Sequence, residues 1–556
     1  MPATLADWLA LLSFGVLLAM FAGPPLFLVL LWSRDRRQQQ HAVLRAFPLL
    51  GRLRYLLEHI GPELRQYLFD ADAAGKPFSR NEFLSVVFAA KYLKTLISFG
   101  SKRDFEAPGW YLRNAFFPSL AGDLAVASRP ALETNRYEIA HEGLFHRRET
   151  LGPARVAPWT LDDAHALTLG SGLAAPWIVR GLVGVSGMSY GALGGHAIRA
   201  IAEGVAMATG SWINTGEGGL SEHHLAGGGD VIFQIGPGCF GVRSADGRFD
   251  WDGLRRKGDL AQVRGFELKL HQGAKIRGGH LEGAKVTEEI ARLRGVEPWK
   301  PVDSPNRFPF LADVDALLDH VARMREATGK PVGVKVVIGG PGSADALADA
   351  MARRGDGPDW ITVDGGEGGS GATYQEMADS MGLPVRSGIV VLDDALRRAG
   401  VRDRVRVIAS GRLFSADRAA IALALGADMV NVARGFMIAV GCIQAQRCHT
   451  NQCPAGVATT DPDRMRALVV DEKKWRAMNF VITLRAGLAS LAAAAGLSSP
   501  TRFERRHAVY RDAEGRVHSG DVLHPHPERE SVAVGLGNRE RVAARLRVSP
   551  GSPTRS

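Results

Sequence analysis

Cysteine is scarce in this chain of 556 residues: there are four, and three of them lie in one short segment near residue 450. Secreted domains stabilised by disulfides carry many more for their length, so we expect reduced thiols in the cytosol. No nucleic-acid module is recognisable and the net charge of +10 is spread over both ends, so no nucleic-acid partner is expected. Hydrophobic residues make up 46% and charged residues 23%, which indicates neither disorder nor a multi-span membrane protein.

Glycine is abundant instead, with 65 residues that often gather in short clusters. The clusters at 216–219, 236–241 and 365–371 are neither periodic nor low in complexity. Because glycine has no side chain, such turns can approach a ligand closely. We therefore expect these clusters to line a ligand site.

The segment from Trp8 to Trp32 is uncharged and long enough to cross a bilayer as one helix. Tryptophan at both ends is typical of membrane interfaces, and Arg34, Arg36 and Arg37 follow directly. By the positive-inside rule, these arginines place the rest of the chain in the cytoplasm, beneath the inner membrane. A cleaved signal peptide is the alternative, but the run is too long and no small-residue cleavage site follows it.

The chain divides into four parts by pattern. Residues 1–41 form the expected transmembrane anchor, and residues 42–150 form a helical membrane-proximal region with basic and aromatic positions. Residues 151–500 carry strand and helix patterns in alternation, and residues 501–556 form a C-terminal tail without an interpretable function. The chemistry is therefore expected between residues 151 and 500.

Eight short apolar, β-branched runs follow one another from residue 180, and each leads into a helical pattern. They are 182–186, 211–215, 231–235, 266–270, 332–338, 360–364, 405–410 and 429–433. Eight strand–helix units predict an α/β fold, a closed TIM (β/α)8 barrel with insertions. The active site of such a barrel lies at the carboxyl ends of its strands.

Glycine-rich loops follow the sixth, seventh and eighth predicted strands. They are GGEGGSGA (365–372), GRLFSAD (411–417) and RGFM (434–437). Barrels build phosphate sites from the backbone N–H groups of these loops, so a phosphate-bearing cofactor is predicted. A nicotinamide fingerprint at Gly340 and Gly342 is only partial, because Asp345 stands at the third glycine position. The pattern therefore favours a flavin.

Cys442, Cys448 and Cys453 have the spacing C-x5-C-x4-C, with proline directly after the last cysteine. Zinc sites usually contain closely paired C-x2-C ligands, so this spacing favours another metal. Thiolates are the usual ligands of iron–sulfur clusters, and Cys-Pro is a recurring ending. The hypothesis is a cluster with three protein ligands, and the alternative is three small buried residues. Cys239 is either a fourth ligand or an inert thiol.

Six motifs, including one of these glycine loops and the cysteine segment, occur in order between residues 180 and 460. They are GMSYGAL (187–193), NTGEGG (214–219), QGAK (272–275), KVTEEIARLR (285–294), GGEGGSGA (365–372) and RCHTNQCPAGVAT (447–459). Together they resemble the FMN-binding synthase domain of glutamate synthase, and more closely its short membrane-anchored relatives. The resemblance implies FMN and a three-iron, four-sulfur (3Fe-4S) cluster held by Cys442, Cys448 and Cys453.

The resemblance also implies roles for single residues. Glu217 and Lys275 correspond to catalytic residues near the flavin and 2-oxoglutarate, and Arg294 to an arginine that pairs with a substrate carboxylate. His280 falls in the substrate loop, and Lys335 corresponds to a lysine beside the flavin ring, where positive charge stabilises the reduced flavin. The expected flavin-loop residues are Met188, Ser189, Gly366, Gly368, Gly369, Gly411, Arg412, Arg434 and Gly435.

The implied reaction reduces 2-iminoglutarate, formed from 2-oxoglutarate and ammonia, to glutamate. Electrons would pass from a donor protein through the cluster to FMN. Residue 2 is Pro, where the family's amidotransferase has a cysteine nucleophile, so glutamine hydrolysis is not expected. The family's QGAKPGEGGQ loop is here QGAKIRGGH, one residue shorter, with Arg277 and His280 where an acidic and an amide side chain are usual.

Three hypotheses follow. The first is an ammonia-dependent or partner-fed glutamate synthase. The second is a flavin and iron–sulfur oxidoreductase or transferase for another keto or amino acid, such as an N-substituted glutamate, and the altered loop at 276–283 favours it. The third is a membrane-bound electron carrier with a decayed substrate pocket, and the retained Glu217, Lys275 and Arg294 argue against it.

Overall fold

The computed structural model describes residues 4–38, 42–94, 100–101, 103–142, 147–273, 275, 278–369 and 371–527. Two compact units make up the chain, Met1–Glu82 and Phe83–Ser556. The first contains the N-terminal helices, and the second contains the barrel. All the predicted catalytic, cofactor and cluster residues belong to the second unit.

The first unit is a succession of helices. They are α1 (Leu5–Arg37), α2 (Ala42–Ala46), α3 (Leu50–Leu64) and the short π-helix η1 (Arg65–Phe69). The apolar part of α1, Leu11–Arg37, has a mean hydropathy of 2.3, and none of its most apolar stretch is buried. The helix therefore has the length and composition of a membrane span or a signal sequence.

Eight parallel strands close into a barrel in the second unit. They are β8 (Val183–Val185), β9 (Trp212–Asn214), β10 (Asp230–Ile235), β11 (Val263–Lys269), β14 (Val332–Val336), β15 (Trp360–Asp364), β16 (Arg406–Ser410) and β17 (Met429–Val432). Neighbours in this series pair with each other, and β17 closes the ring against β8. The predicted TIM barrel is confirmed, and each of the eight predicted strands overlaps one observed strand.

A fully buried carboxylate, Glu267, joins strands across the barrel interior. Its Oε1 accepts hydrogen bonds of 2.7 Å from both Asn214 Nδ2 and Gln234 Nε2. Its Oε2 accepts from Trp360 Nε1 at 3.1 Å and from Thr362 Oγ1 at 2.5 Å. These donors come from three other strands, so the charge is hydrogen-bonded on both oxygens, as a buried carboxylate must be to avoid a large desolvation cost.

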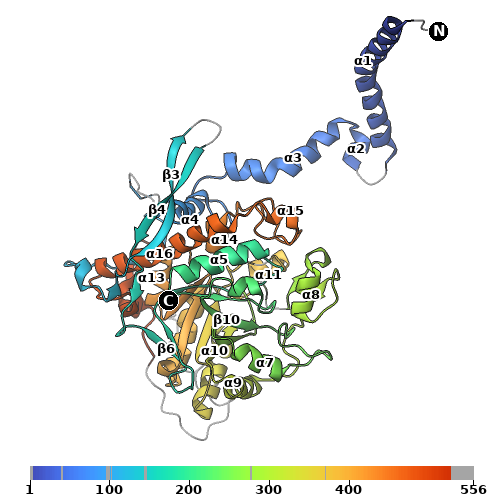
Figure 1. Cartoon of the computed structure of the whole chain (residues 1–556). Coiled ribbons are helices and arrows are strands. Elements are labelled where there is room, and N and C mark those ends of the chain that lie inside the picture. The colour runs from blue at the N-terminus through green and yellow to red at the C-terminus, as the bar shows by residue number, and fades with distance from the viewer. Residues whose placement is uncertain are drawn as a thin grey trace, which may run out of the picture. The chain divides into compact units, whose positions relative to one another are not determined.

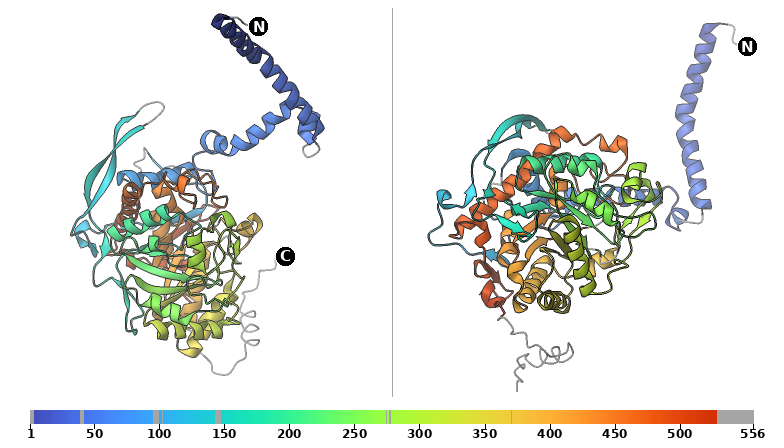
Figure 2. Two further views of the ribbon diagram at one scale, coloured as in Figure 1. Left: turned by 45° about the vertical axis from the view of Figure 1, so that its right-hand side comes forward. Right: turned by 60° about the horizontal axis from the view of Figure 1, so that its bottom comes forward.

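Helices surround the barrel. They include α5 (Gly195–Met207), α6 (Glu222–Leu225), α7 (Trp251–Gly258), α9 (Val314–Thr328), α10 (Pro341–Arg354), α11 (Gln375–Ser380), α12 (Val385–Arg398), α13 (Ala416–Ala424) and α14 (Arg434–Val440). The long helix α16 (Val470–Ala494) packs against α5, α13 and α14 (Figure 1), and Figure 2 shows the body from two further sides. Although α16 is apolar enough for a membrane span, 61% of its most apolar stretch is buried, so it is a core helix.

The longest excursion from the barrel lies between β11 and β14. It contains β12 (His280–Leu281), the 3-10 turn η3 (Gly283–Lys285), α8 (Glu288–Arg294) and β13 (Val302–Asp303). The Thr287 side chain accepts a hydrogen bond from Ile290 N at the start of α8, and Gly295 ends the helix in a left-handed conformation with φ 63°. These caps fix the last residue of α8, Arg294, at the position described below.

The region 42–150, expected to be helical, has its α-helices among the described residues only as far as α4 (Arg80–Tyr92), and a single 3-10 turn, η2 (Ala121–Asp123), lies beyond it. Strands follow α4: β1 (Gly109–Leu112), β2 (Val126–Ala127), β3 (Leu132–Glu142) and β4 (Arg147–Val156). The β3–β4 pair extends outward from the body (Figure 1). Its base is tied to α16, because Thr134 Oγ1 donates to Asn479 Oδ1 at 2.6 Å and Asn479 Nδ2 donates to Asn135 O at 2.8 Å. A contact with a helix more than 300 residues away, which local pattern cannot show, holds these strands in place.

Residues 501–527, expected as part of a C-terminal tail, belong to the second unit and pair there with its strand β1. The strand β18 (Ala508–Arg511) pairs with β1 on one side and with β19 (Val517–Ser519) on the other. Residues 528–556 lie outside the described residues.

Candidate active site

Glu217 forms the centre of a charged cluster at the carboxyl end of the barrel. It follows β9, and its Oε1 accepts hydrogen bonds from Lys269 Nζ at 2.7 Å and from Lys275 Nζ at 3.2 Å. Lys269 is the last residue of β11, and Lys275 belongs to the loop that follows. The three side chains are 13%, 7% and 5% exposed, so water screens their charges only weakly.

The pKa values of this cluster follow from its burial and its charges. Burial alone would raise the pKa of Glu217, but the attraction of Lys269 and Lys275 outweighs it and holds that pKa well below its usual range. Burial lowers the pKa of Lys269 to about 7, against the opposing attraction of Glu217. A lysine that titrates near neutral pH beside a permanent carboxylate is typical of a catalytic site.

Arg294 adds a second cationic group, which interacts electrostatically with Glu217. It is 5% exposed, and its Nη2 donates to Tyr190 O at 3.0 Å. Its guanidinium carbon lies 5.2 Å from the centre of the Phe240 ring, and its buried Nε has no hydrogen-bond partner among the described residues. Burial lowers its pKa to about 10. A buried guanidinium with unused donors is suited to bind a carboxylate.

Two glycines make room for Glu217. A Cβ added at Gly279 would lie 2.7 Å from both Glu217 Oε1 and Lys275 Nζ, and one added at Gly236 would lie 2.3 Å from Glu217 Oε2. No real Cβ atom tolerates such distances. The carboxylate is therefore enclosed by backbone on two sides.

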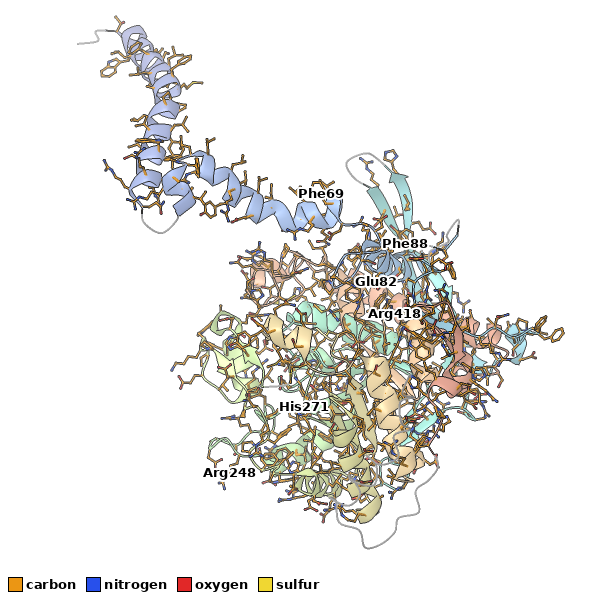
Figure 3. The ribbon with its side chains drawn as sticks, turned by 180° about the vertical axis from the view of Figure 1, so that it is seen from behind. Phe69, Glu82, Phe88, Arg248, His271 and Arg418 are labelled. Carbon is orange, nitrogen blue, oxygen red and sulfur yellow. The ribbon has the colours of Figure 1, made fainter. Side chains whose placement is uncertain are left out.

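A second group of polar residues lies on the neighbouring strands β14 and β15. Lys335, 4% exposed on β14, has its Nζ 3.1 Å from Asp364 Oδ2, and the same oxygen accepts from Gly273 N at 3.0 Å. His271 lies just after β11 (Figure 3), and its buried Nδ1 has no hydrogen-bond partner within the described ranges. Burial lowers the pKa of His271, so its ring is neutral at physiological pH.

The glycine loops predicted to bind a cofactor meet at this end of the barrel. A Cβ added at Gly369 would lie 3.0 Å from Arg434 Nε. The same arginine donates a hydrogen bond from its Nη2 to Glu367 O at 2.6 Å. On the other side of the barrel, a Cβ at Gly216 would lie 2.6 Å from Ser189 N. Gly411 and Arg412 have φ values of 148° and 49°. Since β14 to β17, β8 and β9 are successive neighbours, these loops form one continuous arc.

The three clustered cysteines lie in the segment after α14. Each thiol is close enough to the other two to influence its charge: both neighbours raise the pKa of Cys442, and Cys453 raises that of Cys448, in addition to the larger effect of burial. Burial is the main cause that raises the pKa of Cys442 to about 12. The three thiols are therefore close enough to one another for a metal group to bind them together.

Lys285 connects the cysteine segment to the barrel loops. Its Nζ, on a side chain only 2% exposed, donates to Ala192 O at 2.9 Å, to Cys448 O at 3.0 Å and to Ala458 O at 3.3 Å. Cys239 belongs to a different place, the loop after β10, with its Sγ 3.9 Å from Pro237 O. Its pKa is raised to about 11 by burial and is influenced by Arg243, not by the three other cysteines.

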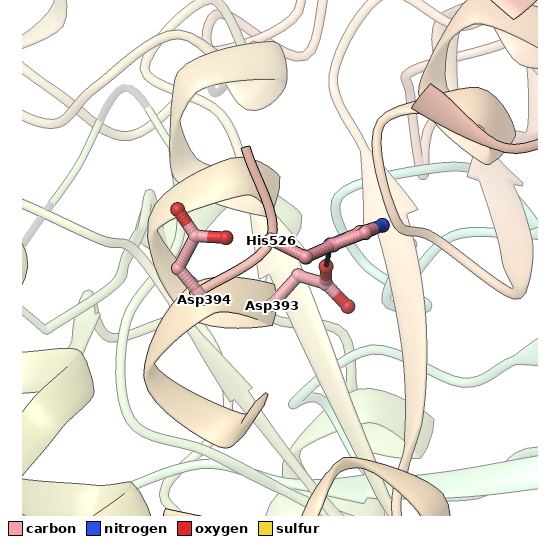
Figure 4. A group of neighbouring side chains, drawn as sticks. All are labelled: Asp393, Asp394 and His526. Carbon is pink, nitrogen blue, oxygen red and sulfur yellow. Dashed lines mark ion pairs between the residues drawn. The ribbon is translucent and has the colours of Figure 1, made fainter. Parts of the chain in front are cut away.

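Within the described ranges, one group of three acidic or imidazole side chains has metal-like spacing: Asp393, Asp394 and His526 (Figure 4). Asp393 is already hydrogen-bonded by three arginines, from Arg397 Nε at 2.8 Å, Arg402 Nε at 2.7 Å and Arg505 Nη2 at 2.8 Å. These positive charges would repel a cation. The group therefore holds the C-terminal segment to α12 instead of a metal.

Comparison with known proteins identifies the family. The family model described as "Conserved region in glutamate synthase" matches residues 160–498, more than half of the chain. The chain belongs to the glutamate synthase family.

The glutamate synthase name is carried both by a relative that matches over nearly its whole length and by relatives that match over about half of theirs. The chain is 47% identical over 516 residues to the glutamate synthase large subunit-like protein YerD of Bacillus subtilis, with 93% of this chain and 98% of that one covered. It is 33% identical over 320 residues to the archaeal glutamate synthase [NADPH] of Methanocaldococcus jannaschii, covering 57% and 59% of the two chains. With the archaeal-type enzyme of Thermotoga neapolitana the identity is 33%, with 53% and 55% covered. The chain thus spans little more than half the length of these two NADPH enzymes.

The fold and the family together support a glutamate synthase-like oxidoreductase. The residues also fit the groups that the family implies. Lys335 and His271 Nδ1, which has no hydrogen-bond partner within the described ranges, are polar groups that a flavin can engage, and the backbone N–H groups of glycine loops are the usual means of holding a phosphate. Cys453 is buried and Cys442 and Cys448 are partly buried, and thiols of this kind are the ligand type that iron–sulfur clusters use.

Among the predicted site residues, the structure brings Glu217, Lys275 and Arg294 together. It does not bring His280 to them: His280 Nδ1 is 2.8 Å from Asp303 Oδ1, its Nε2 is 3.3 Å from Glu282 Oε1, and its side chain is 35% exposed. These acidic partners are the main cause that raises the pKa of His280. Arg277 lies outside the described residues. Gly435 packs against α16, where an added Cβ would lie 2.9 Å from Phe480.

The sequence reasoning missed two neighbours of the Glu217–Lys275 pair, Lys269 and Gly279. Lys269 could have been found from the sequence, because Glu267 and Lys269 are the charged residues, at alternate positions, of the otherwise apolar predicted strand 266–270. Alternate residues of a strand point to the same side, so both had to face the barrel interior.

Proposed function

We propose that this protein is a glutamate synthase-type enzyme that reduces 2-iminoglutarate, formed from 2-oxoglutarate and ammonia, to glutamate. The observation that carries the proposal is the buried arrangement of one carboxylate and two lysines, Glu217, Lys269 and Lys275, with Arg294 beside it. The net reaction consumes 2-oxoglutarate, ammonium, two electrons and two protons, and yields glutamate and water.

The cationic side chains would bind the dicarboxylate. Arg294 has a planar guanidinium, which suits a carboxylate better than an ammonium group does, and its Nε has no partner in the part of the chain that the structure describes. Lys269, with a pKa of about 7, carries a proton in roughly half of the molecules at neutral pH and can give it to a substrate oxygen or nitrogen. Glu217 holds both lysine ammonium groups in place, so that the substrate meets a preorganised site.

The cofactors of the proposal are FMN and a 3Fe-4S cluster. Lys335, Met188, Ser189 and the loops containing Gly366, Gly368, Gly369, Gly411, Arg412 and Arg434 would hold FMN, which supplies hydride transfer when bound. Cys442, Cys448 and Cys453 would hold the cluster, which supplies one-electron transfer. An electron-donor protein would complete the system.

We also propose that α1 spans the inner membrane once and leaves the second unit in the cytoplasm. None of its most apolar stretch is buried, and its last turn contains three arginines.

A second candidate is an oxidoreductase or transferase of the same construction acting on another keto or amino acid, such as an N-substituted glutamate. The observation that favours it is that His280 pairs with Asp303 and Glu282 instead of contacting the Glu217 cluster. The substrate pocket then differs from the family pattern at this position.

The test is anaerobic purification of the full chain in detergent, followed by a visible spectrum and photoreduction. Flavin and iron–sulfur bands, with reoxidation by 2-oxoglutarate plus ammonium and formation of glutamate, are expected. Bands without reoxidation by this pair would favour the second candidate. A colourless protein would contradict both.

A further inference from the structure

Helix α3 carries an apolar face that the described residues do not cover. Leu50, Leu53 and Leu57 are 75%, 56% and 51% exposed, and Leu56 and Ile60 beside them are 53% and 36% exposed. Positions three, four and seven apart lie on one side of a helix, so these side chains form one stripe along α3. We call it the α3 stripe; Tyr67 and Leu68 of η1, 53% and 69% exposed, continue it.

The other side of α3 is polar. Arg54 and Glu58 form an exposed i,i+4 ion pair of 2.7 Å, and Arg65 follows the helix. The basic residues that precede α3 in the first unit are Arg34, Arg36, Arg37 and Arg45. An apolar stripe opposite a charged face, with basic residues around it, is the composition of a helix that lies in a membrane interface and attracts anionic lipids.

The direction of α3 is fixed by a buried contact with the end of α1. Asp35, 1% exposed, accepts hydrogen bonds from Arg52 Nε at 2.9 Å and Arg52 Nη2 at 2.6 Å, and its Oδ2 also accepts from Leu49 N at 3.1 Å. Leu49 has a φ of 66°, which marks a sharp turn at the start of α3. Within this unit α3 accordingly runs away from the end of α1, in a direction at an angle to the axis of α1 (Figure 1).

The short connection between the two helices keeps α3 near the end of the apolar helix α1. Leu50 comes only 13 positions after Arg37, the last residue of α1 (50 − 37 = 13). Side chains project from both sides of α1 and α3 in Figure 3, where Phe69 marks the end of η1. Where α1 crosses a membrane, a helix turned across its cytoplasmic end lies along the membrane surface.

We propose that α3 is an interfacial helix whose stripe inserts into the cytoplasmic leaflet among anionic lipids. The inference rests on the proposed membrane span of α1. The Asp35–Arg52 pair sets the angle between the two helices, so that one crosses the bilayer while the other lies in its surface. The protein is then held by two elements, one spanning and one peripheral.

Photo-crosslinking in the full chain tests this proposal. The photoreactive residue benzoylphenylalanine is placed at Leu57 in the stripe, at Glu58 on the polar face, or at Leu17 in α1, and each protein is reconstituted into vesicles of phosphatidylglycerol and phosphatidylethanolamine. Lipid adducts at Leu57 should exceed those at Glu58 by about tenfold, since only the stripe reaches the acyl chains. Replacing phosphatidylglycerol with phosphatidylcholine should lower the adducts at Leu57 severalfold, and not at Leu17.

The outcomes separate the two proposals. Two results would overturn the interfacial helix and leave the span intact, provided that Leu17 forms lipid adducts. One is equal lipid labelling at Leu57 and Glu58, and the other is the formation of protein adducts at Leu57. An absence of lipid adducts at Leu17 would overturn the span itself, and the inference with it. The variant Arg52→Met is expected to lower the lipid adducts at Leu57 without changing those at Leu17, because it removes the contact that directs α3.

Discussion

Lys269 Nζ lies 2.7 Å from Glu217 Oε1, at the point where β11 ends beside the loop after β9. Both side chains are almost fully buried, so each charge depends on the other for compensation. The protonation state of this pair therefore affects both the stability of the protein and the ability of the site to bind an anionic substrate.

Removal of the carboxylate should destabilise the protein. Glu217→Gln leaves Lys269 and Lys275 facing each other without a counter-charge, and we expect the free energy of unfolding to fall by about 3 kcal/mol at pH 7. Because the pKa of Glu217 is depressed in the folded state, its stabilisation is present above its ordinary value of 4.5 and is lost as the pH falls below that value. Denaturant unfolding in detergent should therefore show the two proteins converging in acid. The matched control Glu58→Gln, in an exposed pair, should change little.

Binding of 2-oxoglutarate should weaken as the pH rises past neutrality. Lys269 has a pKa of about 7, so it is protonated below that pH and loses the charge that attracts a dicarboxylate above it. We expect the affinity, measured by titration calorimetry, to fall by up to roughly tenfold per pH unit above about 7. Lys269→Arg keeps its charge at every pH tested and should flatten the profile. An unchanged profile in that variant would show that another group controls binding.

A methyl group at Gly279 should damage the site more than the fold. Gly279→Ala places a Cβ 2.7 Å from Glu217 Oε1 and Lys275 Nζ, and overpacking of this kind costs about 1–3 kcal/mol. Turnover should fall at least about tenfold through displacement of Glu217 or Lys275. Gly342→Ala is the control, since nothing lies within 4 Å of its added Cβ, and it should retain wild-type turnover.

We expect Cys448 to be a ligand of the iron–sulfur cluster and Cys239 not to be one. Cys448→Ser is expected to abolish the iron–sulfur electron paramagnetic resonance signal and most of the bound iron, because serine is a poor ligand in such clusters. Cys239→Ser should leave both unchanged, since Cys239 lies in the loop after β10. Iron retained in the first variant, or lost in the second, would contradict the proposed ligand set.

We expect Lys285 to hold the cysteine segment against the barrel loops. Lys285→Met removes the donor to three carbonyl oxygens, and a single buried carbonyl left unsatisfied costs about 1–3 kcal/mol. We expect a lower thermal midpoint and faster release of iron to a chelator. Lys285→Arg keeps the charge and should recover part of the loss. Equal behaviour of the two variants would show that shape, not hydrogen bonding, is what this position requires.

Local pattern was sufficient to predict the barrel. Short β-branched runs ending in glycine or charge gave all eight strands, because each strand of a parallel barrel is buried on both faces and is therefore apolar throughout. The same pattern could not predict β3 and β4, whose sequences LETNRYEIAHE and RRETLGPARV are polar at many positions. Their pairing depends on each other and on Asn479 of α16.

The sequence by itself determined the class of fold, the family and the residue types available for chemistry, since these depend on periodicity and on motifs a few residues long. Only the tertiary structure decided which of those residues meet. Lys269 and Glu217 are 52 positions apart, and Lys285 and Cys448 are 163 apart. His280 was placed by motif in the substrate loop, yet pairs with Asp303 and Glu282. The physical reason is that a barrel brings the ends of all its strands to one edge, while burial and charge then select which side chains pair there.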